Sequence, residues 1–192
     1  LKEFTLPDGK AGRALSLLLG DETGMARLTV WDEAVDDGLG LKEGDIVEFQ
    51  PTSFRRRFGD LELHLRKRGF LSKLASRSHR APSWVERLVS IRDLDGRRGY
   101  VTVEGVAGTV PSARRVTTAK GRETQVVSFS LGDSSGEVRV SAWGALADKA
   151  MGLAAGSHVR LRHGRIVRGR SGERELSTSV FSSLEVTGEE KA

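Results

Sequence analysis

Two tryptophans in this sequence each follow an arginine at the same spacing. Arg27 stands four residues before Trp31, and Arg139 stands four residues before Trp143. Because side chains alternate between the two faces of a β-strand, residues four apart lie on the same face of an extended chain. Each indole ring is therefore expected to lie beside a guanidinium group. An aromatic surface beside a cation is the combination that binds the bases and phosphates of a single-stranded nucleic acid.

Further basic residues and one more aromatic residue gather in short segments that flank these pairs. Arginine is the prevalent cation, and its guanidinium group both pairs with phosphate and stacks on bases. The predicted ligand-binding residues are Arg27, Trp31, Arg55, Arg57, Phe58, Arg114, Arg115, Lys120, Arg139, Trp143, Arg168 and Arg170.

Each of these residues also has a purely structural interpretation. A single tryptophan in a strand is commonly part of a hydrophobic core, Phe58 could anchor its loop, and the loop arginines could simply be solvated. The shared face with arginine disfavours burial of Trp31 and Trp143, because arginine is rarely buried. We therefore expect both indole rings to be exposed.

The two Arg–Trp pairs lie in two copies of one sequence pattern. Residues 19–31 and 131–143 align without a gap, and both contain Leu-Gly-Asp-x-x-Gly before the arginine. The same offset continues to Gly44 and Gly156. Asp in the first position and Gly in the fourth suit a tight β-turn, so we interpret this motif as structural. The repetition predicts two copies of one small domain.

Alternating and β-branched segments predict short strands in both copies. In the second copy the expected strands are 99–110, 124–131, 137–143, 157–167 and 173–186, with a short helix at 145–151. In the first copy they are 12–19, 26–31, 46–54 and 61–71, with a turn at 32–38 in place of the helix. Five strands with a helix between the third and the fourth are the order of an OB-fold, a five-stranded barrel.

The sequence therefore predicts an all-β protein of two tandem five-stranded OB-fold barrels. The first barrel is expected to lack its opening strand in this fragment, with further sequence upstream, and the second to carry a short helix between strands three and four. The expected boundaries are 1–74 for the first OB-fold, 75–92 for a linker with a short helix from Trp84 to Ser90, 93–187 for the second OB-fold and 188–192 for a tail.

OB-fold barrels bind oligonucleotides across strands two and three, between the loop joining strands one and two and the loop joining strands four and five. The Arg–Trp pairs fall on strand three of each copy. Arg114, Arg115 and Lys120 are expected in the first of these loops of the second copy. The second loop is expected to hold Arg55, Arg57 and Phe58 in the first copy and Arg168 and Arg170 in the second.

The composition limits the possible functions. The net charge of +5 favours a polyanionic partner, although a GC-rich genome would also enrich arginine over lysine. The sequence has no cysteine, its four histidines lack the spacing of metal ligands, and it has no nucleophile–base set or P-loop. We expect no enzymatic activity, no cofactor, no metal and no small-molecule substrate. Without a membrane-length apolar run or a signal peptide, an intracellular, nucleoid-associated protein is expected.

The order of motifs resembles the tandem OB domains of archaeal replication protein A. The motifs are Gly-Asp-x-x-Gly, Arg-x-x-x-Trp, Leu-x-x-Gly and a Glu-Leu pair in the last strand, in both copies, and the segment 91–94 before a Val-Glu-Gly-Val strand resembles the lead-in of those domains. The resemblance implies that single-stranded DNA (ssDNA) is held by Arg27, Trp31, Phe58, Arg139 and Trp143. The second copy departs from the family pattern because its Arg168–Arg170 loop has no aromatic residue, and the family's cysteine-bound zinc module is absent.

The resulting hypothesis is sequence-tolerant ssDNA binding in replication, recombination and repair, with other replication or repair proteins as further partners. Two alternatives remain open from the sequence. The same groove could bind acidic peptides in a repair complex, or it could bind RNA, since nothing in the sequence separates ribose from deoxyribose.

Overall fold

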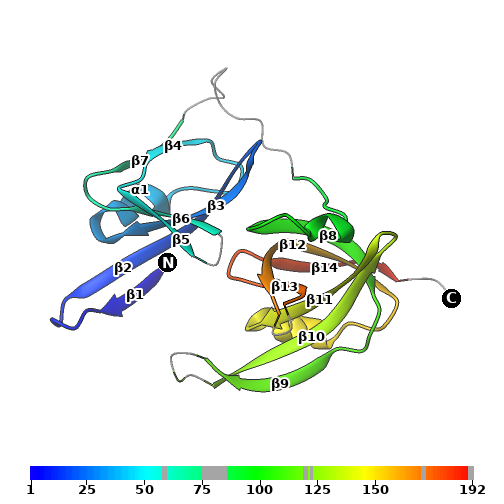
Figure 1. The fold of residues 1–192 in the computed structure, drawn as a ribbon. Helices are drawn as coiled ribbons and strands as arrows, with labels where there is room; N and C mark the ends of the chain where they lie inside the picture. Colours follow the sequence, from blue (N-terminus) through cyan, green and yellow to red (C-terminus); the bar gives the residue numbers. More distant parts are fainter. Residues whose placement is uncertain (58–59, 75–85, 119–120, 122, 170–171, 190–192) are drawn as a thin grey trace. The chain divides into compact units, whose positions relative to one another are not determined.

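The computed structural model describes residues 1–57, 60–74, 86–118, 121, 123–169 and 172–189 (Figure 1). The chain divides into two compact units, Leu1–Val85 (unit 1) and Glu86–Ala192 (unit 2). An all-β protein is predicted, and the described chain is mostly β, with strands dominating both units beside a few short helices.

Unit 2 contains a closed barrel of five strands. The strands are β8 (Tyr100–Ala107), β10 (Glu123–Asp133), β11 (Gly136–Trp143), β12 (Ser157–Arg168) and β13 (Arg174–Ser177). The ring runs from β8 through β10, β11, β13 and β12 and back to β8, and only the β11–β13 pair is parallel. Two further strands pair outside the ring, β9 (Ser112–Thr117) with β10 and β14 (Ser183–Glu189) with β12. The predicted helix appears as α2 (Ala145–Met151), between β11 and β12.

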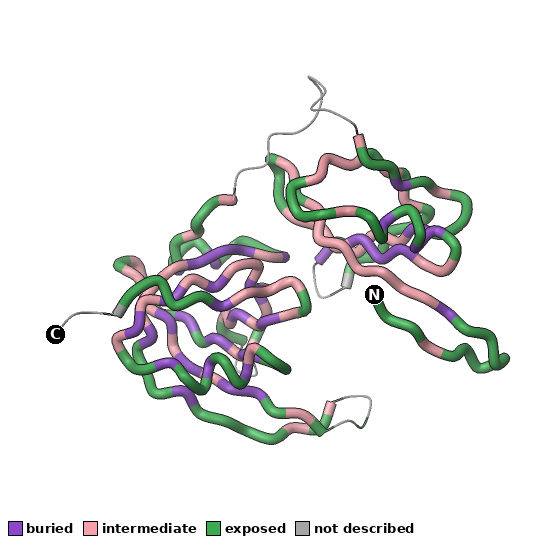
Figure 2. The backbone as a smooth tube through the Cα atoms, turned by 180° about the vertical axis from the view of Figure 1, so that it is seen from behind, coloured by how far each residue is buried: buried purple, intermediate pink, exposed green. Residues whose placement is uncertain are grey.

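Alternate side chains of the strands point into the core of this barrel and out to its surface. Val138, Val140 and Ala142 of β11 are buried in the core, whereas Arg139 and Trp143 are exposed. The alternation of buried and exposed positions along the strands is visible in Figure 2. The period of two therefore puts the second Arg–Trp pair on the outer face of the barrel, as the sequence predicts.

β8 and β10 approach each other closely at a pair of glycines. A Cβ atom added to Gly105 would lie 2.3 Å from the carbonyl oxygen of Gly132. Since real Cβ atoms do not come so near, only glycine fits here without a backbone shift. Gly105 therefore allows the crossing of β8 over β10 that closes the ring.

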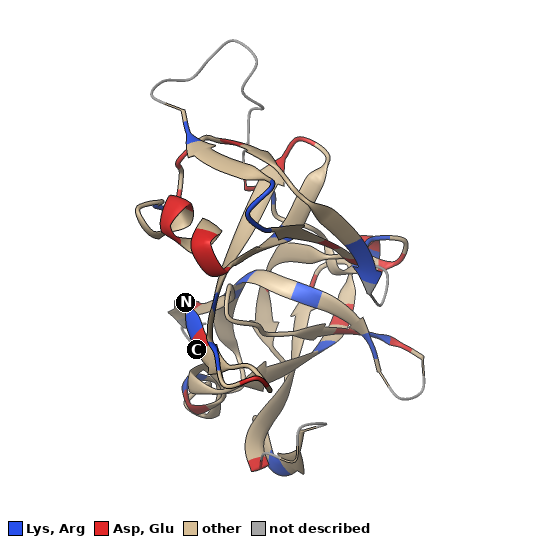
Figure 3. Ribbon diagram, turned by 90° about the vertical axis from the view of Figure 1, so that its left-hand side faces the viewer, with Lys and Arg blue, Asp and Glu red and all other residues tan. Residues whose placement is uncertain are grey.

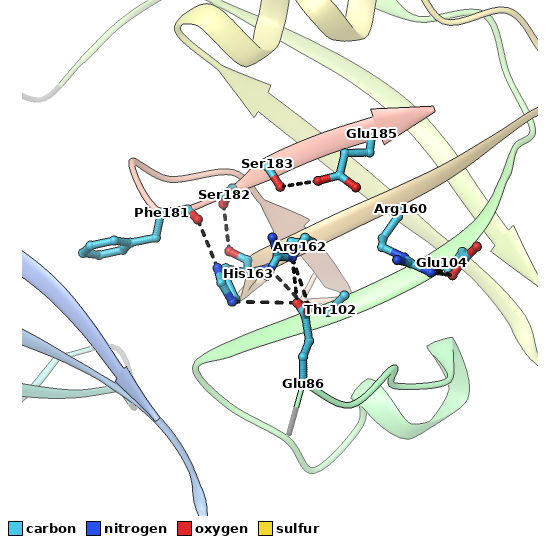
Figure 4. A network of polar contacts seen from close by, with 10 residues as sticks. All are labelled: Glu86, Thr102, Glu104, Arg160, Arg162, His163, Phe181, Ser182, Ser183 and Glu185. Carbon is cyan, nitrogen blue, oxygen red and sulfur yellow. Dashed lines mark hydrogen bonds and ion pairs between the residues drawn. The ribbon is translucent and has the colours of Figure 1, made fainter. Parts of the chain in front are cut away.

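Glu86, the first described residue of unit 2, is fastened to the barrel by a polar network (Figure 4). Its Oε1 atom accepts hydrogen bonds from Thr102 Oγ1 at 2.7 Å and from Arg162 Nε at 3.0 Å. Burial raises the pKa of Glu86, but the bonds to Arg162 and Thr102 outweigh it and hold the pKa below its ordinary value. Ser182 Oγ donates to the carbonyl of His163 at 2.7 Å and ties the turn before β14 to the same place.

The predicted helix from Trp84 to Ser90 is wrong over its described part. Residues 86–90 have no helical turn, and Leu88 instead forms a parallel β-bridge with Thr102. The capping-box pattern at 83–86 is overridden because Glu86 bonds to the barrel rather than to a helix terminus. Trp84 itself lies outside the described residues.

Unit 1 is built from two separate sheets. The larger sheet has the order β1 (Lys2–Thr5), β2 (Ala11–Asp21), β3 (Gly24–Trp31), β6 (Asp60–Leu65) and β5 (Ser53–Arg57). The smaller sheet pairs β4 (Val47–Gln50) with β7 (Phe70–Lys73). The described strands of unit 1 form no closed ring, so a second closed barrel is not confirmed. A compact core nevertheless forms around Leu28, Val30, Ala34, Leu65 and Leu71.

Several predicted strands and one predicted turn are corrected. The strand expected at 46–54 is divided into β4 and β5 at Pro51, which has no backbone N–H to donate to a ladder. The strands expected at 61–71 and 173–186 are each interrupted by a turn. The turn expected at 32–38 is instead a 3₁₀ turn (Asp32–Ala34) followed by α1 (Val35–Leu39), because Ala34 and Val35 are buried in the core.

Acidic residues gather on this short helical segment of unit 1, at Asp32, Glu33, Asp36 and Asp37 (Figure 3). None of the described helices is long and apolar enough to cross a membrane.

Candidate nucleic-acid interface

The outer face of β11 holds Trp143 and Arg139 in fixed positions in unit 2. The indole Nε1 of Trp143 donates to Ser177 Oγ on β13 at 3.0 Å, and Trp143 keeps 37% of its surface exposed. Arg139 Nη2 donates to Ser128 Oγ on β10 at 3.2 Å. Its Nε atom also lies 4.0 Å from Glu175 Oε1 on β13. The two strands beside β11 therefore orient both side chains while leaving the ring accessible.

Unit 1 repeats this arrangement with equivalent residues. Arg27 Nη2 on β3 donates to Ser16 Oγ on β2 at 2.9 Å. Trp31 Nε1 donates to His64 Nδ1 on β6 at 3.2 Å. Ser16 corresponds to Ser128 at the offset that carries Trp31 onto Trp143. In each unit the Arg–Trp pair is thus held by the two strands beside its own strand, β2 and β6 in unit 1 and β10 and β13 in unit 2.

Trp31 is more enclosed than Trp143. Its ring meets the ring of Phe4 edge-on, with centroids 6.1 Å apart, and lies at 27° to the ring of His64. The guanidinium carbon of Arg66 lies 5.0 Å from its centroid. Trp31 is half-buried, yet these neighbours are polar or lie at the sheet surface, and Trp31 is not part of the hydrophobic core.

His64 is a neutral acceptor in this cluster. Burial is the main cause that lowers the pKa of His64; Glu62 opposes it, and Arg55, Arg66 and Arg27 each lower the pKa by a smaller amount. Because Nδ1 accepts the indole N–H, the ring proton belongs on Nε2. The histidine therefore fixes the Trp31 ring only while it is unprotonated.

This pKa shift makes the stability of unit 1 depend on His64 in acid. The unfolded chain takes up a proton near the ordinary histidine pKa of about 6.5 before the folded protein does, so stability is full above that pH and falls below it. We expect thermal unfolding to show a smaller loss of stability between pH 7.5 and 5 for His64→Gln than for the wild type. His158→Gln, in unit 2, should keep the wild-type loss. An equal acid loss in His64→Gln and wild type would contradict the assignment.

The loop predicted between strands one and two of the second copy is a strand instead. Arg114 and Arg115 lie on β9, which continues the sheet as the outer strand of a hairpin with β10. Val126 is the cross-strand partner of both Arg114 and Trp143, so these three residues share one face. Arg115 is the next residue along β9 and points to the other face. The structure thus brings Arg114, but not Arg115, into line with the indole.

The predicted basic loop of the first copy is also partly strand. Arg55 on β5 is paired with Glu62, which is paired with Arg27, so Arg55 shares the face of the Arg–Trp pair. Arg57 ends β5 as the backbone partner of Asp60. Arg168 is exposed at the end of β12 and donates from Nη1 to the carbonyl of Gly172 at 3.1 Å. Phe58, Lys120 and Arg170 lie outside the described residues.

Four residues of this interface do not appear in the sequence prediction, namely Lys2, Phe4, His64 and Arg66. Lys2 is the cross-strand partner of Ala14, which is in turn the partner of Trp31, and it stands where Arg114 stands in unit 2. Lys2 aligns with Arg114 in the repeat, so the sequence already contains the information that would have predicted Lys2 as a site residue. The other three are brought to Trp31 by pairings that the sequence pattern does not reveal.

Comparison with curated proteins finds an archaeal relative. The chain is 30% identical over 180 residues, 85% of its length, to Replication factor A of the archaeon Methanothermobacter thermautotrophicus, and it spans 22% of the length of that protein. The sequence matches no protein-family model. The predicted resemblance to archaeal replication protein A is confirmed.

Two solved structures are similar to this chain. The structure of a replication protein A heterotrimer bound to ssDNA is similar with a TM-score of 0.52 and 18% identity, over 96% of this chain and 45% of that one. A replication factor A related protein from Methanobacterium thermoautotrophicum has 27% identity and a TM-score of 0.44, over 52% of this chain and 90% of that one. The heterotrimer comparison shows a shared fold.

Proposed function

From its homology to Replication factor A, we propose that this chain binds single-stranded DNA with little dependence on sequence. The observation that carries the proposal is the repeated outer-face arrangement, in which an arginine and a tryptophan are held by the two neighbouring strands in each unit. In unit 2 the hydrogen bond to the ring N–H leaves the face of the Trp143 indole for stacking. In unit 1 Arg66 and His64 lie against the Trp31 ring, so a base that stacks there displaces Arg66. The pairs Arg27–Trp31 and Arg139–Trp143 are the proposed centres of the two binding surfaces.

In this proposal, bases stack on the tryptophans and phosphates pair with basic residues of the same faces. Every base has a π face, so stacking tolerates any sequence, at about 1–3 kcal/mol per base by alanine substitution. Lys2 and Arg55 in unit 1 and Arg114 in unit 2 share the faces of the indoles and supply cations for the backbone. Arg57, Phe58, Arg115, Lys120, Arg168 and Arg170 remain proposed contacts.

We further propose that each unit is an OB-fold, with the boundaries 1–74 and 93–187. The offset that carries Trp31 onto Trp143 carries β1, β2 and β3 onto β9, β10 and β11, which supports one common topology. A role in replication, recombination and repair, together with other proteins of those processes, follows as the biological setting of such binding.

Titration with poly(dT), followed by tryptophan fluorescence, tests the proposal. We expect quenching, with duplex DNA competing less well at fixed salt, because its paired and stacked bases are not accessible for stacking on tryptophan. Competition by poly(rU) at the same salt separates DNA from RNA as the ligand. With about six phosphates neutralised, log affinity should fall against log salt with a slope on the order of −4. Absence of quenching by poly(dT) would reject the proposal in favour of a protein-interaction module, and stronger competition by poly(rU) would reassign the ligand to RNA.

A further inference from the structure

The turn that follows β6 in unit 1 carries three consecutive cations. Arg66, Lys67 and Arg68 are all exposed, directly after the fully buried Leu65. The turn is closed by a hydrogen bond from Gly69 N to the carbonyl of Arg66 at 2.8 Å. The three basic side chains therefore project from a defined backbone turn into solvent.

Packing holds this turn in place. A Cβ atom on Gly69 would lie 2.3 Å from the carbonyl oxygen of Gln50 and 2.4 Å from Leu65 Cδ1. The backbone of the turn is thus pressed against the end of β4 and against the core. The backbone that carries these cations is consequently held at one position relative to the sheet, in contrast to a free loop.

The turn lies at the end of the sheet where Trp31 stands. β6 runs parallel to β3, with Leu65 opposite Val30, so Arg66 leaves the sheet beside Trp31. Arg66 covers the Trp31 ring at 5.0 Å, and its Nη1 lies 3.9 Å from Asp32 Oδ2. Both partners of this ion pair are well exposed, so the pair is weak and a phosphate can replace the carboxylate.

Unit 2 has no such cations at the equivalent place. When the two copies are aligned so that Glu62 matches Glu175, the residues of the turn match Ser179, Val180 and Phe181. Val180 is 85% exposed, and Ser179 is bonded to Ser182 within its own turn. The two units therefore differ by three positive charges at one equivalent position next to the proposed stacking tryptophan.

We propose that the turn Arg66–Arg68 is a phosphate-binding site that extends the ssDNA path of unit 1 past Trp31, and that unit 2 lacks it. The inference rests on the proposed function. A strand whose base stacks on Trp31 continues with a charged phosphate at each nucleotide, and the turn is the cationic surface beside that ring. Unit 1 then carries the larger share of the salt dependence of binding.

The matched test compares two double variants that remove the same charge. Lys67→Ser/Arg68→Ser removes two cations of the turn, and Lys42→Ser/Lys149→Ser removes two exposed cations beside α1 and on α2. Oligo(dT) affinity is measured at several salt concentrations. The turn variant should reduce the magnitude of the log–log salt slope by about 1.4, while the control should leave it within error, since each ssDNA phosphate contact contributes about 0.7.

A gain of charge gives the complementary test. Val180→Lys places a cation at the position in unit 2 that corresponds to Lys67, and it should steepen the slope by about 0.7. All these side chains are exposed, so unchanged thermal unfolding of each variant shows that the fold is intact. Wild-type binding with an unchanged slope in Lys67→Ser/Arg68→Ser would overturn the turn site alone. Failure of the wild type to bind oligo(dT) would overturn the proposed function together with it.

Discussion

Replacing Trp143 with alanine is expected to weaken ssDNA binding by about 1–3 kcal/mol, roughly 5- to 150-fold, without unfolding unit 2. The ring is exposed on the outer face, and its single hydrogen bond, to Ser177 Oγ, is replaceable by water. The other bond of this residue runs from its backbone N to Thr178 Oγ1 at 2.9 Å and persists in the alanine variant. The loss in affinity should therefore report stacking rather than a change of fold.

Oligo(dT) titration by fluorescence anisotropy measures this loss, with thermal unfolding as the check on the fold. Met151→Ala removes another exposed apolar side chain, from α2, and should bind like the wild type. Trp31→Ala should also weaken binding, but it additionally removes the packing of Phe4, His64 and Arg66 around the ring. Wild-type affinity in both tryptophan variants would remove stacking from the mechanism.

Substitution of Gly105 by alanine should destabilise unit 2 by about 1–3 kcal/mol. The added methyl group would meet the carbonyl oxygen of Gly132 at 2.3 Å, and that oxygen belongs to backbone that cannot rotate away. Relief of the clash requires β8 and β10 to separate at Val106 and Gly132, the pairing that closes the ring. At about 4–8 °C per kcal/mol for a domain of this size, the melting temperature should fall by several degrees or more.

Gly188→Ala is the control for this substitution. Gly188 lies in β14, and a Cβ atom there would have no heavy atom within 4 Å, so its melting temperature should stay that of the wild type. A Gly105→Ala protein that unfolds at the same temperature as Gly188→Ala would show that β8 and β10 have room at their crossing.

Local patterns predict the parts of this fold whose cause is local. The alternation in β11 alone determines which side chains enter the barrel, and α2 runs from Ala145 to Met151 as the sequence predicts. β9 escapes prediction because its basic residues Arg114 and Arg115 are typical of a loop, and it becomes a strand only by pairing with β10. Likewise α1 forms from a segment of low helix propensity because the helical turn buries Ala34 and Val35 in the core.

The candidate site also has a part that the sequence predicts and a part that only the structure shows. Each Arg–Trp pair is found from sequence because its members are four residues apart on one strand. His64 and Arg66 reach Trp31 only through the parallel pairing of β3 with β6, which joins segments distant in the chain. A period of two within one strand contains no information about which strand lies beside it. Cross-strand partners of the indoles therefore become visible only in the structure.

The anchoring of Glu86 has a consequence for how the two units share one ligand. Leu74 N donates to the carbonyl of Ile46 at 2.9 Å, and Glu86 bonds to Thr102 and Arg162, so the last described residue of unit 1 and the first of unit 2 are each bonded to their own unit. Once one unit has captured a strand, the chain that joins the units confines the other to its neighbourhood, at an effective concentration of about millimolar for short linkers. Under the proposed function, a strand long enough to reach both units is therefore expected to bind with avidity, while shorter oligonucleotides gain nothing from the duplication.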